Sequence, residues 1–268
     1  GRTTGRSARI AEDNRAVIEQ SSSRRATCRR LSSRVPGVAG VGPPPLFPCA
    51  RPCDARPNGM ARQSPDDSFE TAALARGFAR VAGVDEVGRG PLAGPVTAAA
   101  VVLDPDNLPV GLDDSKRLAK SRREALYDEI LARAAVGIGH ASVAEIDTHN
   151  LRRASHIALL RAVPALDPAP DHLLIDGNMI PTGCTVSAEA IVKGDGKSLS
   201  IAAASIVAKV IRDRIMVGLA QQHPGYGWET NVGYPSKSHI SALQSLGVTP
   251  HHRRSFKPVH NILYQEKS

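Results

Sequence analysis

The sequence predicts an α/β fold in which a mixed β-sheet carries helices on both faces. Three early apolar runs of strand length are followed by runs that alternate with segments of helical periodicity. Three of the apolar runs end at a carboxylate, which is the end at which open α/β sheets place their ligands. The folded domain is expected over residues 76–268.

The first two predicted strands flank a glycine-rich turn. The run from Arg80 to Glu86 ends in two adjacent carboxylates, and a second run follows from Gly94 to Leu103. Glycine is common at tight turns between paired strands, so these runs are expected to form a hairpin-like pair. The later apolar runs predict three more strands, at Val136 to Val143, Leu173 to Ile175 and Thr185 to Val192.

Helical spacing of apolar residues marks four further segments. They are Ser121 to Ala134, Ala144 to Val163, Leu199 to Gln222 and Pro235 to Leu246. Ser121 and Glu124 have the spacing of a capping box. Pro224 and Gly225 stop the longest of these helices.

Four carboxylates at strand ends predict a divalent metal site. Asp85 and Glu86 end the first strand, Asp176 follows the fourth, and Asp195 follows the fifth. Mg²⁺ and similar hard cations prefer oxygen ligands, and two such ions roughly 3.5–4 Å apart can activate water and stabilise a leaving oxygen. One Asp before a Gly is often only a turn residue. All four together, beside a turn that carries an arginine, favour metal-assisted chemistry on a phosphodiester.

The two adjacent carboxylates impose a local condition on this site. Neighbouring side chains on a regular strand point to opposite faces. Asp85 and Glu86 can therefore line one site only if the strand ends or bulges there, which Gly88 and Gly90 would permit.

Residues 1–75 are expected to be a disordered extension. Residues 1–59 hold eleven of the 34 Lys and Arg residues but only four of the 26 acids, so most of the net charge of +8 belongs to this segment. It is rich in Arg, Ser and Pro and offers little apolar surface to offset chain ordering. The composition fits a transit peptide and fits equally well a stretch translated upstream of a start at Met60.

Several classes of protein are disfavoured by the sequence. No apolar run approaches the ~20 residues of a membrane span. Cys184 is the one cysteine of the expected domain, and the histidines are scattered, so neither a disulfide framework nor a nucleophilic triad is indicated. A cytoplasmic, monomeric protein without a membrane partner is the expectation.

Six blocks of the chain resemble bacterial ribonuclease HII. They are VAGVDEVGRGPLAGPV (81–96), DDSKRLAKSRREALYDEI (113–130), LLIDGN (173–178), KGDGKSLSIAAASIVAKVIRDR (193–214), GYP (233–235) and HHRRSF (251–256). Their order and spacing agree across residues 80–258, whereas the first 75 residues have no recognisable counterpart. Relatives often carry a basic residue just before GYP, where this chain has Asn231 and Val232.

The resemblance implies a ribonuclease H-like fold, a five-stranded mixed sheet flanked by helices with a C-terminal helical portion. It implies hydrolysis of the RNA strand of RNA–DNA hybrids and incision of duplex DNA 5′ of embedded ribonucleotides, which leaves 3′-hydroxyl and 5′-phosphate ends. Asp85, Glu86, Asp176 and Asp195 would bind Mn²⁺ or Mg²⁺. The Gly88–Arg89–Gly90 turn would sense the ribose 2′-hydroxyl, and Tyr234 would pack against the sugar.

The remaining polar candidates have two readings each. Ser115 and Lys116 would contact a phosphate, or they form a solvated entry to a helix. Asp213, between two arginines, favours a structural ion pair over a metal-ligand role. A role in core packing is favoured for Ser205, Tyr226 and Trp228. The roles of Lys209, Arg253 and Arg254 stay open.

Two other functions compete with the ribonuclease. One is a non-catalytic nucleic-acid binding module on the same fold. The other is a nuclease without ribose selectivity. A mere binder has no reason to bring four carboxylates to a phosphate backbone, which disfavours the first.

Overall fold

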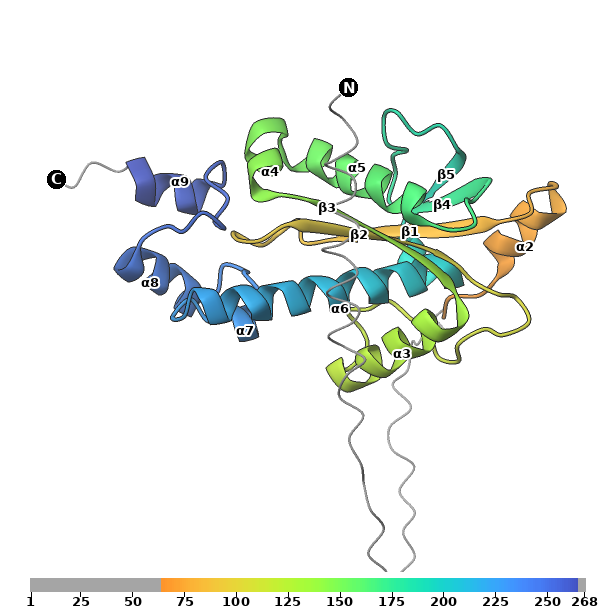
Figure 1. Cartoon of the computed structure of the whole chain (residues 1–268), viewed down its shortest axis with the longest axis horizontal. Coiled ribbons are helices and arrows are strands. Elements are labelled where there is room, and N and C mark those ends of the chain that lie inside the picture. The colour runs from red at the N-terminus through yellow and green to blue at the C-terminus, as the bar shows by residue number, and fades with distance from the viewer. Residues whose placement is uncertain (1–63, 265–268) are drawn as a thin grey trace, which may run out of the picture. The chain divides into compact units, whose positions relative to one another are not determined.

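A computed structural model describes residues 64–264, and the expectations for residues 1–63 lie outside this range. Five strands form one sheet in the order β3-β2-β1-β4-β5 (Figure 1). β1 pairs antiparallel with β2, which pairs antiparallel with β3, whereas β4 lies parallel to both β1 and β5. The predicted mixed sheet is confirmed. The strands are β1 (Val81–Val87), β2 (Val96–Val102), β3 (Ala135–Ala141), β4 (His172–Asp176) and β5 (Ser187–Ile191).

Helices cover both faces of this sheet, as predicted (Figure 1). On one face, Ala82 and Val84 of β1 share an apolar cluster with α5. On the other, Ala99 and Val101 of β2 share a cluster with α3 and α6. The described helices are α2 (Ser68–Ala75), α3 (Lys120–Arg133), α4 (Val143–His149), α5 (Leu151–Ala162), α6 (Leu199–Gln222), α7 (Trp228–Asn231), α8 (Lys237–Leu246) and α9 (Lys257–Tyr264).

The long helix α6 packs directly on β1. Gly83 of β1 faces the main chain of Ser200 and Ile201 so closely that a Cβ there would clash. Ala202, Ala203 and Ala204 follow on the helix and are fully buried. This small-residue contact fixes the N-terminal end of α6 against the middle of β1.

The C-terminal helices form a small core of their own around the end of α6. Trp228, Leu243 and Val259 are fully buried in it, and Tyr226 stacks on Trp228 with the ring centroids 5.1 Å apart. The predicted packing role of Tyr226 and Trp228 is confirmed.

Two local predictions about helices are wrong. The segment 144–163 is two helices, because Asn150 adopts a φ of 68° and its side chain accepts a hydrogen bond from the N–H of Arg153 to cap α5. The capping box belongs to Ser142 and Glu145 at α4. Helix α3 begins at Lys120 without a side-chain cap, so the Ser121 spacing had no structural meaning.

The folded part begins earlier than residue 76. Helix α2 lies inside the segment assigned to the extension and packs Ala73 and Phe69 against Leu174 and Ile201. Glu70 of α2 accepts hydrogen bonds from the Ser200 main-chain N–H at 2.8 Å and from the hydroxyls of Ser198 and Ser200. These contacts tie α2 to the N-terminus of α6.

Candidate active site

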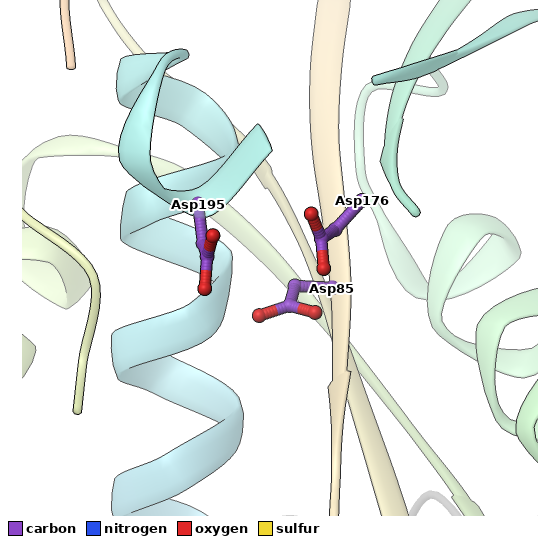
Figure 2. Close-up of side chains that lie close together, drawn as sticks. All are labelled: Asp85, Asp176 and Asp195. Atoms are coloured by element: carbon purple, nitrogen blue, oxygen red, sulfur yellow. The ribbon is translucent and has the colours of Figure 1, made fainter. Parts of the chain in front are cut away.

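Three aspartates from separate segments converge at one edge of the sheet (Figure 2). Asp85 lies on β1, Asp176 ends β4, and Asp195 lies in the 3₁₀ turn Gly194–Gly196 that precedes α6. One carboxylate oxygen of each lies within 4.8 Å of the others. The parallel register pairs Val84 with Ile175, so the next residues, Asp85 and Asp176, come side by side at the carboxyl end of the two strands.

Burial and mutual repulsion make this triad costly without a counter-charge. Asp85 and Asp195 are each only 7% exposed. Burial, followed by repulsion from Asp176, Glu86 and Asp195, raises the pKa of Asp85 well above its ordinary value. Burial and then Asp195 raise the pKa of Asp176 as well. Three converging hard oxygen donors in a buried acidic site fit a divalent cation such as Mg²⁺ or Mn²⁺.

Two contacts hold the carboxylates in place. The main-chain N–H of Gly194 donates to Asp176 Oδ1 at 2.7 Å, which links the end of β4 to the turn that carries Asp195. Lys116 Nζ lies 3.0 Å from Asp195 Oδ2. Partial burial lowers the pKa of Lys116, but the hydrogen bond to Asp195 and the negative charges of Asp195, Asp114 and Asp85 together outweigh burial and raise the pKa overall. Lys116 is thus a fixed positive charge beside the triad.

Glu86 lies on the opposite face of β1 from Asp85. The pairing with β2 runs without a bulge from Gly83 to Val87, so the expected strand break is absent and the side chains alternate regularly. The Glu86 carboxylate lies 3.2 Å from Arg89 Nη1. It lines the same cleft as Asp176, on the side where α5 contributes Ser155 and His156. The structure therefore gathers three of the four predicted carboxylates tightly and places the fourth in a cleft that it shares with Asp176 alone of the triad. Nothing in the helical pattern of α5 had marked its residues as part of this cleft.

The glycine-rich turn follows directly after β1. Gly88 has a φ of 98°, a conformation that favours glycine. Gly90 lies against the ring of Tyr234, since a Cβ on Gly90 would be 3.1 Å from Tyr234 Cε1. His239 Nδ1 is 2.9 Å from the Tyr234 carbonyl oxygen and donates to it. Tyr234 is 42% exposed, so it is accessible beside the turn.

The loop that carries Ser115 and Lys116 is anchored to α6. The main-chain N–H of Ser115 donates to Ser205 Oγ at 3.2 Å, and both residues are buried. Ser205 therefore has the predicted packing role. The Lys116 side chain, in contrast, is 74% exposed and reaches back toward Asp195.

The remaining charged candidates have structural partners. Lys209 Nζ lies 2.8 Å from Asp213 Oδ1, so the ion pair predicted for Asp213 is confirmed. Arg253 is fully buried and binds main-chain carbonyl oxygens, and the main-chain N–H of Arg254 donates to Asp147. A buried arginine is unusual, and no pattern in the sequence identified this role. Within residues 64–264, none of the helices has the length and apolar character that crossing a membrane requires.

Known proteins resemble the chain in both sequence and fold. The family model described as Ribonuclease HII matches residues 82–259. The ribonuclease HII of Ruegeria sp. (strain TM1040) is 68% identical over 218 residues, which cover 81% of this chain and 94% of that protein. The crystal structure of the ribonuclease H2 from Pyrococcus horikoshii OT3 matches with a TM-score of 0.61 at 27% identity, over 70% of this chain and 98% of that one. Bst-RNase HIII, solved in complex with Mn²⁺, shares the fold with a TM-score of 0.56 at 18% identity, over 70% of each chain.

Both levels of similarity agree with the site. The matched residues contain all three aspartates of the triad, the glycine-rich turn and Tyr234. The sequence resemblance to a family of endoribonucleases and the predicted ribonuclease H-like fold are confirmed. The chain belongs to the ribonuclease HII family.

Proposed function

We propose that this endoribonuclease cuts the RNA strand of RNA–DNA hybrids and incises duplex DNA on the 5′ side of an embedded ribonucleotide, leaving 3′-hydroxyl and 5′-phosphate ends. The observation that carries the proposal is the aspartate triad, with Asp85 and Asp195 buried, beside a glycine-rich turn and an exposed tyrosine. The triad supplies a place for phosphodiester chemistry, and the turn and the tyrosine supply a place for a sugar.

Asp85, Asp176 and Asp195 would hold a divalent cation, and Glu86 would complete the metal-binding set from across the cleft that it shares with Asp176. When bound, Mg²⁺ or Mn²⁺ lowers the pKa of a coordinated water and neutralises phosphate charge. The donors of the triad are all carboxylate oxygens, which suits either ion.

Other residues of the chain would position the substrate. Lys116 is exposed, stays protonated and lies beside the triad, so its ammonium group can contact a phosphate oxygen next to the scissile bond. Ser115 supports this role through its anchored main chain rather than through its buried hydroxyl. The turn Gly88–Arg89–Gly90 brings main-chain groups close to a sugar, because glycine has no Cβ to keep the sugar away.

Tyr234 would select the nucleotide together with this turn. Its ring lies against Gly90 and the residue is exposed, so the ring can lie against a ribose. The 2′-hydroxyl is the group by which a protein distinguishes RNA from DNA at a single position. Turn and ring therefore define the two sides of a ribose site.

The decisive test uses a DNA duplex that contains one ribonucleotide. With Mn²⁺ or Mg²⁺ we expect a single cut 5′ of the ribonucleotide, and with EDTA we expect none. An RNA–DNA hybrid of the same sequence should be cleaved in its RNA strand. Equal cleavage in EDTA would remove the metal mechanism, and equal cleavage of an all-DNA duplex would indicate a nuclease without ribose selectivity.

A further inference from the structure

Two buried arginines lie beneath the glycine-rich turn, and the ribonuclease activity alone does not explain them. Arg212 of α6 and Arg253, in the segment before α9, are both 0% exposed. Within residues 64–264, each of their hydrogen bonds goes to a main-chain carbonyl oxygen and none to a carboxylate. Burial lowers the pKa of Arg212 to about 10 and that of Arg253 to about 9, so both are charged at neutral pH. A buried cation without an anionic partner is costly and calls for a functional reason.

Arg253 binds the turn itself. Its Nη2 donates to the carbonyl oxygen of Gly88 at 2.6 Å, and its Nη1 donates to that of Arg89 at 3.1 Å. The same guanidinium also donates to the carbonyl oxygen of Gly94, on the far side of the turn, from Nε at 3.0 Å and from Nη2 at 2.8 Å. The planar fork thus joins both ends of the loop between β1 and β2.

Arg212 connects this loop to the segment that carries Tyr234. It donates to the carbonyl oxygens of Ala93 and Pro95 at 3.1 Å each and to that of Val232 at 3.0 Å. Gly88 has to be glycine here, because a Cβ on it would clash with the Arg212 guanidinium. The two arginines therefore fix the turn and the Tyr234 segment relative to each other.

The direction of the carbonyl groups determines the direction of the amides. In a trans peptide the C=O and the following N–H point to opposite sides. Because the carbonyl groups of Gly88 and Arg89 point at Arg253, the N–H groups of Arg89 and Gly90 point away from it. Within residues 64–264 neither N–H donates to a protein acceptor, and both residues are exposed. Two donors without a protein acceptor in the described residues, both directed away from Arg253 and backed by buried positive charge, form a site suited to an anion or a hydroxyl oxygen.

We propose that Arg253 and Arg212 are positioning residues that aim the main-chain N–H groups of Arg89 and Gly90 at the ribose 2′-hydroxyl and the adjacent phosphate. This inference rests on the proposed function, since it explains how the turn selects the ribonucleotide. Tyr234, against Gly90, closes the other side of the same sugar site.

The test measures ribose recognition separately from folding. The Arg253→Met variant keeps much of the side-chain volume but has no donors. The matched control is Leu243→Ala, which removes a fully buried side chain from the C-terminal core that Trp228 and Val259 also form. The readout is the ratio of the Kd for an all-DNA duplex to the Kd for the same duplex with one ribonucleotide, measured by fluorescence anisotropy in EDTA below the Tm of each variant.

We expect the wild-type protein to prefer the ribonucleotide duplex, and Arg253→Met to lower the ratio by at least about fivefold. Leu243→Ala should keep the ratio within about twofold of wild type, although both variants lose thermal stability. A folded Arg253→Met protein with an unchanged ratio would overturn the inference, as would an equal loss in Leu243→Ala.

Arg253→Lys keeps the positive charge but replaces the planar guanidinium, with its several donors, by a single ammonium group. It replaces Arg253→Met in the test if that variant does not fold. We expect it to lower the ratio by at least about threefold, and an unchanged ratio overturns the positioning role. A wild-type protein that does not incise the ribonucleotide duplex contradicts the proposed function. Incision by the wild type without any binding preference contradicts this inference alone.

Discussion

At the scale of single residues, Asp85 shows the conflict between stability and catalysis most clearly. Without a metal its buried carboxylate faces other acids, and its pKa is raised. We expect Asp85→Asn to lower the cleavage rate at least about a thousandfold, equivalent to about 4 kcal/mol of transition-state stabilisation. In EDTA the same variant should gain about 1 kcal/mol in free energy of unfolding, a Tm rise of about 2–4 °C, because a repelled charge is removed.

The control for this prediction is Asp213→Asn. Asp213 is likewise an aspartate of the folded domain, but it lies on α6 outside the triad and pairs with Lys209. This variant should keep its activity and gain no stability in EDTA. A lower Tm for Asp85→Asn in EDTA would contradict the electrostatic account of the triad.

Sequence patterns could identify the residues whose role follows from their position at the end of a strand. Asp85, Asp176 and Asp195 follow apolar runs, and strand ends meet at the ligand-binding edge of such sheets. The separation of Glu86 from the triad follows from strict alternation on β1, which the sequence could not establish because the neighbouring glycines allowed a bulge. Arg253 was out of reach, since arginine is normally exposed and its carbonyl partners come from residues far away in the sequence.

At the scale of elements, the contact between β1 and α6 sets the distance between Asp85 and Asp195. Gly83 faces the Ser200 main chain without room for a Cβ. We expect Gly83→Ala to push the two elements apart, to lower the free energy of unfolding by at least about 3 kcal/mol and to abolish cleavage. Thermal unfolding and the ribonucleotide assay measure these effects.

Gly218→Ala in the same helix is the matched control. Gly218 lies inside α6 with nothing within 4 Å of a Cβ position. This change should stabilise the protein by about 0.5–1 kcal/mol, because alanine favours the helix, and should leave activity unchanged. If Gly83→Ala were as stable and active as the control, close packing of β1 on α6 would not be what holds the site together.

The C-terminal core depends on neutral histidines. Burial and the neighbouring His239 lower the pKa of His252 from 6.5 to about 3, and its Nδ1 accepts a hydrogen bond from the Thr249 N–H at 3.0 Å. The unfolded chain binds this proton near pH 6.5 whereas the folded chain resists it, so the stabilisation is complete above pH 6.5 and is lost as the pH falls toward the folded pKa. We expect the wild type to lose about 2 kcal/mol more than His252→Gln between pH 7 and pH 4.5.

Chemical denaturation of both proteins across this pH range, in EDTA, measures the difference. The His252→Gln variant is expected to be less stable at pH 7, because it loses a buried hydrogen-bond network, but to have the flatter pH profile. Parallel profiles would show that His252 is not the titrating group.

Element types were easier to predict than element boundaries. Long periodic segments such as α6 emerged with their observed bounds, because the stop at Pro224 and Gly225 is a local signal. The break between α4 and α5 was not predicted, because the helical spacing of apolar residues continues through Asn150 although the backbone of Asn150 is not helical. Helix α2 is only eight residues long and its contacts with Leu174 and Ile201 are entirely non-local, so no local pattern separated it from the extension.

At the scale of the whole molecule, the sheet and its two helical layers bring four segments that are distant in sequence together at the carboxyl ends of β1 and β4. Parts of the site come from β1, β4, the turn before α6 and the C-terminal segments that carry Tyr234 and Arg253. A fifth segment supports the site, because the main chain of Asp66, just before α2, pairs with that of Lys197 and Leu199, directly beyond Asp195. The N-terminal boundary of the functional domain should therefore lie before α2.

Two truncations test this boundary. Removal of residues 1–63 takes away the Arg-rich segment, which lies before the family match that begins at residue 82. We therefore expect the Tm of this protein to stay within a few degrees of the full chain and its cleavage rate to stay within about twofold. Removal of residues 1–75 also deletes α2, exposes Leu174 and Ile201, and leaves the hydroxyls of Ser198 and Ser200 without Glu70. That loss should cost about 3 kcal/mol or more, a Tm drop of about 6–12 °C, together with weaker metal binding, because the turn that carries Asp195 loses its support. Calorimetric unfolding and Mn²⁺ titration of the two proteins decide the matter, and equal behaviour of both truncations would show that α2 is dispensable.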